Sequence, residues 1–377
     1  MRWALITGEY PPQPGGVSDY TRVLAGALAA AGDEVHVWAP DYPVLENAAP
    51  LTENHVQVHR LPDRFGRKTF SALGRALDAL PRDCRLLLQY VPHAFGWKAM
   101  NVPFCLWLAS RTRQPFWVMY HEVAYPLSWS QALRLNALGI VTRGMASVLA
   151  RCSERVYVSI PAWKDLLPKS VAMTWLPIPS TVPTSVSGGA RACVRQRLAG
   201  NRNQVLIGHF GTFGVHLTPL LEQILPPLLR ADSRRTALLL GGGSARFAQN
   251  LTRLYPDLEG RCIAPGALPG EELAAHLAAC DILAQPYADG VSSRRTSLMA
   301  GLALGLPIVT TEGHLSEPLW RESRAVALAP VKPATAFVEQ CEAVLQDPNR
   351  QAELRRRASE LYEERFAVAN TVRALRS

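Results

Sequence analysis

Two adjacent arginines, Arg294 and Arg295, are the residues whose types and spacing point most directly to binding chemistry. They follow an apolar segment that ends at Pro286, in a polar loop that carries Asp289 and leads into a helix expected to begin near Thr296. Guanidinium groups form paired hydrogen bonds with phosphate, and the first turn of a helix adds free amide groups. The loop is therefore a candidate cradle for a diphosphate. Solvated arginines on a surface helix are the ordinary alternative.

Polar residues also follow two expected strands in the first half of the chain. Gly15 and Gly16 lie between the first strand and the first helix, where they would let the backbone approach an anion. His121 and Glu122 follow the buried-type strand PFWVMY, and such a pair can donate to a sugar hydroxyl or transfer a proton. The alternatives are an ordinary Pro-Gly turn and a histidine on a surface loop.

Two glycine-bearing loops follow the first strands of the second half. The segment GHFGTFGVH, residues 208–216, contains Gly211 and Thr212 but lacks the G-x-G-x-x-G spacing of a dinucleotide-binding fingerprint. The three glycines at 241–243 fit a tight strand-to-helix turn as well as they fit contact with a ligand. Both loops therefore remain candidates through their position after strands.

The composition indicates a globular protein with two or three domains. Of the 377 residues, 48% are hydrophobic and 19% are charged, which excludes disordered and fibrous proteins. The net charge of +9 suits phosphate ligands, nucleic acid and anionic lipid alike. No segment reaches the roughly 20 apolar residues of a membrane span, and Glu9 interrupts the apolar start too early for a secretory signal. The seven cysteines are odd in number and form no C-x-x-C pair, so we expect reduced thiols in the cytoplasm and no zinc site.

Short apolar runs alternate with helical patterns in two halves. This alternation predicts an α/β protein with doubly wound parallel sheets covered on both faces. The segment 175–192 is rich in Pro, Ser, Thr and Gly, which predicts a linker between two domains. The expected strands are 3–7, 34–39, 56–61, 85–91, 115–120, 155–159, 204–210, 236–240, 261–264, 281–285 and 307–310. The expected helices include 70–80, 131–150, 217–229, 245–254, 271–279, 296–304 and the charged stretch 348–377.

Several of these motifs, in this order, resemble glycosyltransferases of the GT-B fold, specifically glycosyltransferase family 4 (group 1). The opening GEYPPQPGGVSDYTRVLAGALAAAGDEVHVWAP is similar to the first βαβ unit of that family. VLIGHFGTFG, LLLGGGS, ALPGEELAAHLAACDILAQPY and GLALGLPIVTT resemble its donor-binding half. The resemblance implies two Rossmann-like domains facing a central cleft, an acceptor-side domain at 1–182 and a nucleotide-sugar domain at 183–360. It also implies that a C-terminal helix at 361–377 crosses back to the first domain.

The resemblance implies transfer of a sugar from a nucleotide diphosphate sugar, usually with retention and without a metal or cofactor. His121 would face the transferred sugar and Asp289 would hold one of its hydroxyl groups. A retaining enzyme of this kind needs no side-chain nucleophile, whereas an inverting one would need a base such as His121, Glu122 or Asp19. The residues expected to contact the donor are Gly15, Gly16, Gly211, Thr212, Ser292, Ser293, Arg294, Arg295, Thr296, Ser297 and Glu317.

The sequence departs from the family at two motifs. The family usually has two glutamates eight positions apart, but the matching positions are Asp289 and Ser297 in one register and Ser292 and Ala300 in the other. The Arg and Lys expected after the first strand of the second half are also missing, since that segment offers only the histidines 209 and 216. We therefore expect a divergent active subgroup in which Arg294 and Arg295 supply the positive charge.

Two other functions fit the same architecture. A sugar-nucleotide epimerase would alter the sugar without an acceptor, and a non-catalytic sugar-nucleotide-binding subunit would tolerate the missing glutamates. A phosphorylase is disfavoured because the second half has no lysine between Lys169 and Lys332 for a pyridoxal Schiff base. We expect a nucleotide-sugar donor and a small-molecule or lipid-linked glycan acceptor, and no nucleic acid. The aromatic and basic region 93–117 would suit a lipid-linked acceptor at the inner face of a membrane, with a buried helix as the alternative.

Overall fold

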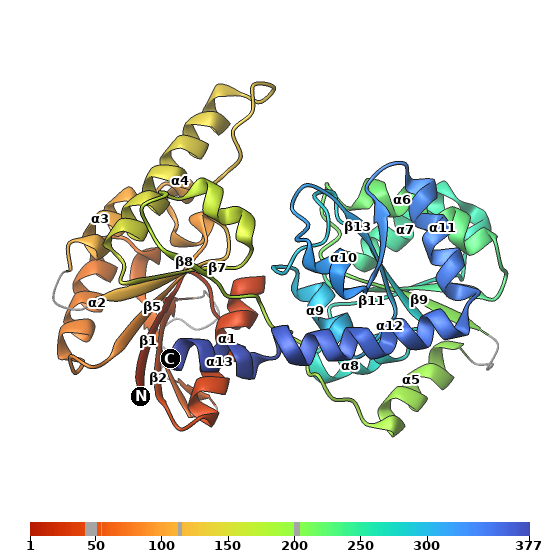
Figure 1. Ribbon diagram of the computed structural model, residues 1–377, viewed down its shortest axis with the longest axis horizontal. Coiled ribbons are helices and arrows are strands. Elements are labelled where there is room, and N and C mark those ends of the chain that lie inside the picture. The colour runs from red at the N-terminus through yellow and green to blue at the C-terminus, as the bar shows by residue number, and fades with distance from the viewer. Residues whose placement is uncertain (42–50, 54, 112–114, 200–203) are drawn as a thin grey trace. The chain divides into compact units, whose positions relative to one another are not determined.

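The computed structural model describes residues 1–41, 51–53, 55–111, 115–199 and 204–377, which form two compact α/β units (Figure 1). Unit 1 consists of Met1–Ile178 together with Val368–Ser377, and unit 2 is the continuous segment Pro179–Ala367. The chain therefore passes from one unit to the other after Ile178 and returns after Ala367.

Unit 1 is built on an eight-stranded sheet in the order β3-β4-β2-β1-β5-β6-β7-β8. Its strands pair in parallel except for the edge strand β3, which is antiparallel to β4. The chain starts in the middle at β1 and proceeds to one edge through β2, and then to the other edge from β5, so the strand order reverses between β1 and β5. The strands are β1 (Arg2–Thr7), β2 (Glu34–Pro40), β3 (Leu51–Glu53), β4 (Val56–Leu61), β5 (Arg85–Tyr90), β6 (Phe116–Tyr120), β7 (Arg155–Val158) and β8 (Met173–Trp175).

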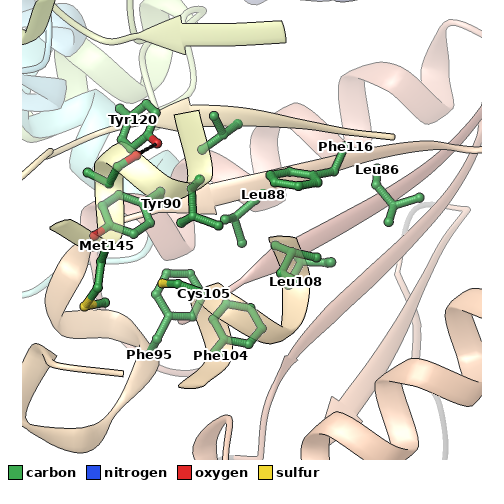
Figure 2. Close-up of a cluster of buried hydrophobic side chains, with 14 of the residues drawn as sticks. Leu86, Leu88, Tyr90, Phe95, Phe104, Cys105, Leu108, Phe116, Tyr120 and Met145 are labelled. Atoms are coloured by element: carbon green, nitrogen blue, oxygen red, sulfur yellow. Dashed lines mark hydrogen bonds between the residues drawn. The ribbon is translucent and has the colours of Figure 1, made fainter. Parts of the chain in front are cut away.

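Helices cover both faces of this sheet because its central strands β1, β5 and β6 are buried at nearly every position. On one face, alternate residues of β5 pack with β6 and the helices α2, α3 and α4 in the cluster that Figure 2 shows. The hydroxyl of Tyr120 is satisfied there by the carbonyl of Ala146, at 2.7 Å. On the other face, Trp3, Leu5 and Leu87 pack with α1 and α13. The helices are α1 (Gly16–Ala30), α2 (Arg67–Ala79), α3 (Val102–Ala109), α4 (Leu133–Cys152) and α13 (Val368–Arg376).

Unit 2 is a six-stranded sheet of parallel pairs in the order β11-β10-β9-β12-β13-β14, the order of a Rossmann fold. The strand order reverses between β9 and β12, and ligands of such sheets bind outside the carboxyl ends of the strands at that point. The strands are β9 (Val205–Phe210), β10 (Arg235–Leu240), β11 (Cys262–Gly266), β12 (Ile282–Gln285), β13 (Ile308–Glu312) and β14 (Ala327–Pro330). The helices are α5 (Gly188–Ala199), α6 (Thr218–Arg230), α7 (Ser244–Leu254), α8 (Gly270–Ala278), α9 (Thr296–Ala303), α10 (Leu319–Ser323), α11 (Ala334–Leu345) and α12 (Pro348–Leu361).

Two expectations about the elements are corrected by the structure. The predicted linker 175–192 is irregular only in part, because Trp175 ends β8 and the residues from Gly188 onward begin α5. The expected helix through 348–377 is interrupted after Leu361 by a π-helical turn at Tyr362–Phe366, and Ala367 separates this turn from α13. Of the described helices, none combines the length and the apolar character that crossing a bilayer requires.

Candidate functional site

The loop between β12 and α9 is held by β13 and by the segment that follows it. The amide of Tyr287 donates to Thr311 Oγ1 at 2.7 Å, and the same hydroxyl donates to the Tyr287 carbonyl at 2.6 Å. Gly290 has a φ of +90°, and a Cβ there would lie 2.3 Å from the amide nitrogen of Gly313. Only glycine fits this position, so the turn that presents Asp289 depends on it.

Asp289 binds both arginines of the predicted diphosphate cradle. Its Oδ2 accepts from Nη2 of Arg294 at 2.6 Å, and its Oδ1 accepts from Nη2 of Arg295. Burial would raise the pKa of Asp289, but the two guanidinium groups outweigh burial and lower it below the usual value. One carboxylate and two guanidinium groups leave the cluster with a surplus of positive charge.

Arg295 has capacity for a further contact. Its guanidinium lies over the ring of Tyr287, 4.8 Å from the ring centre, in a cation–π contact. Its buried Nε–H has no hydrogen-bond partner among the described residues. Arg295 also occupies the N-cap position of α9, and its side chain does not cap the helix. Thr296 is the first residue of α9, where the sequence predicted the helix to begin.

Glu317 anchors the loop from within unit 2. Its carboxylate accepts from the amide and the hydroxyl of Ser293 and from Nε1 of Trp320, the last at 2.6 Å. Only 7% of Glu317 is exposed. The sequence analysis expected Glu317 near the nucleotide, and the structure places its carboxylate on these internal donors.

Of the other polar side chains of the loop, Ser297 is hydrogen-bonded within the protein, whereas Ser292 is buried without a hydrogen-bond partner in the described part of the chain. Ser297 shares a hydrogen bond of 2.9 Å with the hydroxyl of Tyr287. The hydroxyl of Ser292 is fully buried and finds no partner within the described part of the chain. Ser292 is thus the serine of this loop that most needs a ligand or water.

Near the end of β9, His209 offers a hydrogen-bond acceptor close to the end of β12. Its Nδ1 donates to the carbonyl of Ala284 in β12, the neighbouring strand, at 2.8 Å. Burial lowers the pKa of His209 to about 4, so the ring is neutral at pH 7 and Nε2 carries a lone pair. Nε2 is buried and unpartnered among the residues described, and so is Oε1 of Gln285 at the end of β12. A Cβ on Gly211 would lie 3.2 Å from Nε2, so the glycine leaves this side of the ring uncrowded.

From the sequence, His209 was noted only because its segment lacks the Arg and Lys typical of the family, and Gln285 was not recognised as a candidate. Both are polar residues in otherwise apolar strands. His209 is the second-last residue of β9, and Gln285 is the last residue of β12. This was the available signal, because an apolar strand interior tolerates a polar side chain only when it finds a partner. Gly211 and Thr212 follow directly, and Gly241 lies so near the Gly211 carbonyl that a Cβ would approach it to 2.1 Å.

In unit 1, His121 directly follows β6, which pairs with β5, one of the two strands between which the strand order reverses. Its Nε2 donates to Oε1 of Gln89 at 2.8 Å, and its ring meets the ring of Tyr20 edge-on at 4.7 Å. Burial lowers the pKa of His121 to about 3, so the imidazole is neutral. Nε2 of Gln89 and the hydroxyl of Tyr20 are buried without a partner in the described ranges. His121 is therefore a buried, oriented imidazole and not an exposed loop histidine.

The amino end of α1 already holds a carboxylate. Oε1 of Glu9 accepts from the amides of Val17 and Ser18, at 3.1 and 3.2 Å. A Cβ on Gly15 would lie 2.5 Å from that oxygen, whereas Gly16 has open space around it. Gly15 and Gly16 were expected to let the backbone approach an anion, but the carboxylate of Glu9 occupies two amides that follow them. The spacing of Glu9 from Gly15 gives no periodic signal that would have predicted this contact.

The candidates therefore fall into two groups, one in each unit. In unit 2, Asp289 and the loop 292–297 follow β12, whose end is hydrogen-bonded to the end of the neighbouring strand β9, whereas the carboxylate of Glu317 faces inward. Unit 1 holds His121, Gly15 and Gly16, with Asp19 in the first turn of α1 and Glu122 half-buried beside His121. Burial raises the pKa of Asp19.

Two family models match the chain, one in each unit. Residues 15–170 match the glycosyl transferase 4-like domain, and residues 204–347 match the glycosyl transferases group 1 domain. The chain belongs to the group 1 glycosyltransferases, enzymes of the GT-B fold, and the family expected from its sequence motifs is confirmed. No curated protein matches the chain in sequence.

Solved structures share this fold over their whole length. Sucrose-phosphate synthase from Thermosynechococcus elongatus has 17% identity and a TM-score of 0.74, with 100% of this chain and 97% of that one covered. HepE from Anabaena, in complex with UDP-glucose, has 14% identity and a TM-score of 0.70, with 100% and 98% covered. WaaG, a glycosyltransferase involved in lipopolysaccharide biosynthesis, has 14% identity and a TM-score of 0.68, with 99% and 98% covered. At such identities the likeness shows the two-unit GT-B fold.

Proposed function

We propose that this protein transfers a sugar from a nucleoside diphosphate sugar to an acceptor hydroxyl, with retention and without a metal. The observation that carries the proposal is the cluster of Asp289, Arg294 and Arg295 at the start of α9. It lies after β12, at the reversal of strand order where parallel sheets bind ligands. A diphosphate would be attracted by the surplus positive charge and would accept a hydrogen bond from the Nε–H of Arg295. It would compete with Asp289 for hydrogen bonds from the two guanidinium groups.

The nucleoside part would use the acceptors at the ends of β9 and β12. Nε2 of His209 and Oε1 of Gln285 are buried hydrogen-bond acceptors without partners among the described residues. Such atoms suit the hydroxyl and N–H groups of a ribose or a base. The structure of HepE with UDP-glucose supports this class of donor, because that protein has the same fold.

Catalysis in this proposal rests on positioning and on electrostatics. Negative charge grows on the leaving diphosphate as the glycosidic bond breaks, and the two arginines would stabilise it. His121 of unit 1, neutral and fixed by Gln89, would orient a sugar hydroxyl as an uncharged group. The proposal of metal independence follows from the sequence, which has no Asp-x-Asp pair at the end of an expected strand.

We expect the acceptor to be a small molecule or a lipid-linked glycan, in glycan, glycolipid, polysaccharide or glycosylated natural-product biosynthesis in the cytoplasm. The relation of WaaG to lipopolysaccharide biosynthesis supports this context. Region 93–117 contributes a helix, α3, that buries Phe104 and Leu108 and exposes Leu106. Residues 112–114 of that region lie outside the described residues.

Incubation of the full chain with UDP- and GDP-sugars in the presence of EDTA tests the proposal. The expected result is release of UDP or GDP that is stimulated by an acceptor glycan and leaves the anomeric configuration unchanged. Release of an altered free sugar without an acceptor would indicate an epimerase. Tight binding of the donor without turnover would indicate a non-catalytic binding subunit.

A further inference from the structure

The tip of α4 exposes large apolar side chains to solvent. We define the α4 tip as residues 125–140, the loop before the helix and its first turns. It projects beyond the rest of unit 1 (Figure 1). The exposed fractions are 105% for Trp129, 87% for Leu133, 64% for Ile140, 44% for Leu127 and 41% for Leu135. A soluble surface rarely gathers such residues without a partner.

The backbone of the tip is fixed by its own polar side chains. Nδ2 of Asn136 donates to the Ser128 carbonyl at 2.9 Å, and Oδ1 of Asn136 accepts from the Ser128 amide at 3.1 Å. Nε2 of Gln131 donates to the Pro126 carbonyl at 2.9 Å and also to Asn136. The loop thus presents Trp129 in an ordered form, with carbonyl groups satisfied internally, as insertion into a low-dielectric layer requires.

The charges on this element have one sign. Between Val123 and Cys152 the sequence contains no aspartate or glutamate, and its charged residues are Arg134, Arg143 and Arg151. Arg134 is exposed within the tip itself. A protein partner with a mixed surface would not require this bias, whereas a surface of lipid phosphates would favour it.

We propose that the α4 tip docks on the surface of an anionic lipid bilayer. Trp129 and Leu133 enter the headgroup region, where the indole ring contacts apolar chains while its N–H donates a hydrogen bond to a polar group. Arg134 binds lipid phosphates. The helix binds at the surface and does not span the bilayer. This surface differs from region 93–117, for which the sequence left a lipid-facing surface and a buried helix as alternatives, and the proposal does not depend on the proposed sugar transfer.

Flotation of the full chain with vesicles tests the docking. Parent protein is expected to float with vesicles of phosphatidylglycerol and phosphatidylethanolamine, and to float less with vesicles of phosphatidylcholine alone. The double variant Trp129→Ser/Leu133→Ser is expected to bind anionic vesicles about tenfold more weakly or worse. Arg134→Gln is expected to weaken binding and to reduce its dependence on salt. Leu254→Ser, at a residue 58% exposed on unit 2, is the matched control and should float like the parent.

Two outcomes would overturn the proposal. One is equal flotation of the parent and the Trp129→Ser/Leu133→Ser variant. The other is a lipid-free dimer of the parent that the double variant converts to a monomer, since the tip would then be an interface between copies. UDP and GDP binding, measured on the same samples, reports separately on the proposed function. Flotation without nucleotide binding would contradict the sugar transfer and leave the docking surface intact.

Discussion

Asp289 and its two arginines act as one electrostatic group. The carboxylate stays ionised because the guanidinium groups outweigh the cost of burial, and the arginines are held in place by it before any ligand binds. An arriving diphosphate would therefore meet arginines that have already lost much of their side-chain freedom, which reduces the entropic cost of binding. Both carboxylate oxygens of Asp289 already accept from these arginines, so a sugar hydroxyl would share Asp289 with them.

Glu317→Gln is expected to lower the free energy of unfolding by about 1–3 kcal/mol. The carboxylate accepts from Ser293 and Trp320, and an amide places an NH₂ group against one of these donors. Urea denaturation measures the effect, with Glu259→Gln, at an exposed residue of unit 2, as the control. Equal stability of parent and Glu317→Gln would show that Glu317 does not anchor the loop.

Stability is expected to fall as the pH is lowered from 7 to 5, because two histidines are buried neutral. Their folded pKa values, about 3 for His121 and about 4 for His209, lie below the value of 6.5 for the unfolded chain. The unfolded chain therefore binds more protons below pH 6.5, and each histidine lowers the free energy of unfolding at pH 5 by about 2 kcal/mol. Denaturant titrations at both pH values check this. His121→Gln and His209→Gln should each reduce the pH dependence, and a dependence as steep as in the parent would refute the assignment.

The elements could be predicted where the pattern was local. Fully buried strands such as β6 appear as continuous apolar runs. The half-buried β4 alternates apolar and polar residues, and it has the expected bounds 56–61. The short strands β8 and β14 and the start of α5 at Gly188 were missed, because three or four residues carry little periodicity and paired glycines resemble a linker. The position of the candidate site in the loop after β12 could be predicted. The hydrogen bonds that Asp289 and Glu317 make within unit 2 could not. Glu317 binds Ser293 from 24 residues away, and no local pattern marks such a contact.

Glu9→Ala is expected to lower the free energy of unfolding by about 1 kcal/mol, since α1 loses the acceptor for two of its first amides. Chemical denaturation of the parent and the variant measures the change. Asp83→Ala, which removes a carboxylate with 82% of its side chain exposed in the same unit, is the control. No difference between Glu9→Ala and Asp83→Ala would contradict the capping role.

The proposed function places donor binding in unit 2. Hydrogen exchange of the full chain with and without UDP or GDP is expected to slow in peptides covering 209–216 and 286–297 of unit 2. Peptides covering 13–20 at the start of α1 are expected to exchange unchanged, because Glu9 occupies the amides of Val17 and Ser18. Protection confined to 13–20 would place the diphosphate in unit 1 and refute this assignment.

Nucleotide binding by the arginine pair is measured most directly by isothermal titration of UDP and GDP in EDTA. The parent should bind one of them at a single site, and Arg294→Gln/Arg295→Gln should weaken that binding by about 100-fold or more, because each charge-assisted bond contributes about 1.5–3 kcal/mol. Arg295→Lys should recover only part of the loss of Arg295→Gln, since lysine lacks the planar fork. Arg234→Gln, at an exposed arginine of unit 2, should bind like the parent. Equal affinity of the parent and the double variant, or no binding of either nucleotide to the parent, would contradict the account.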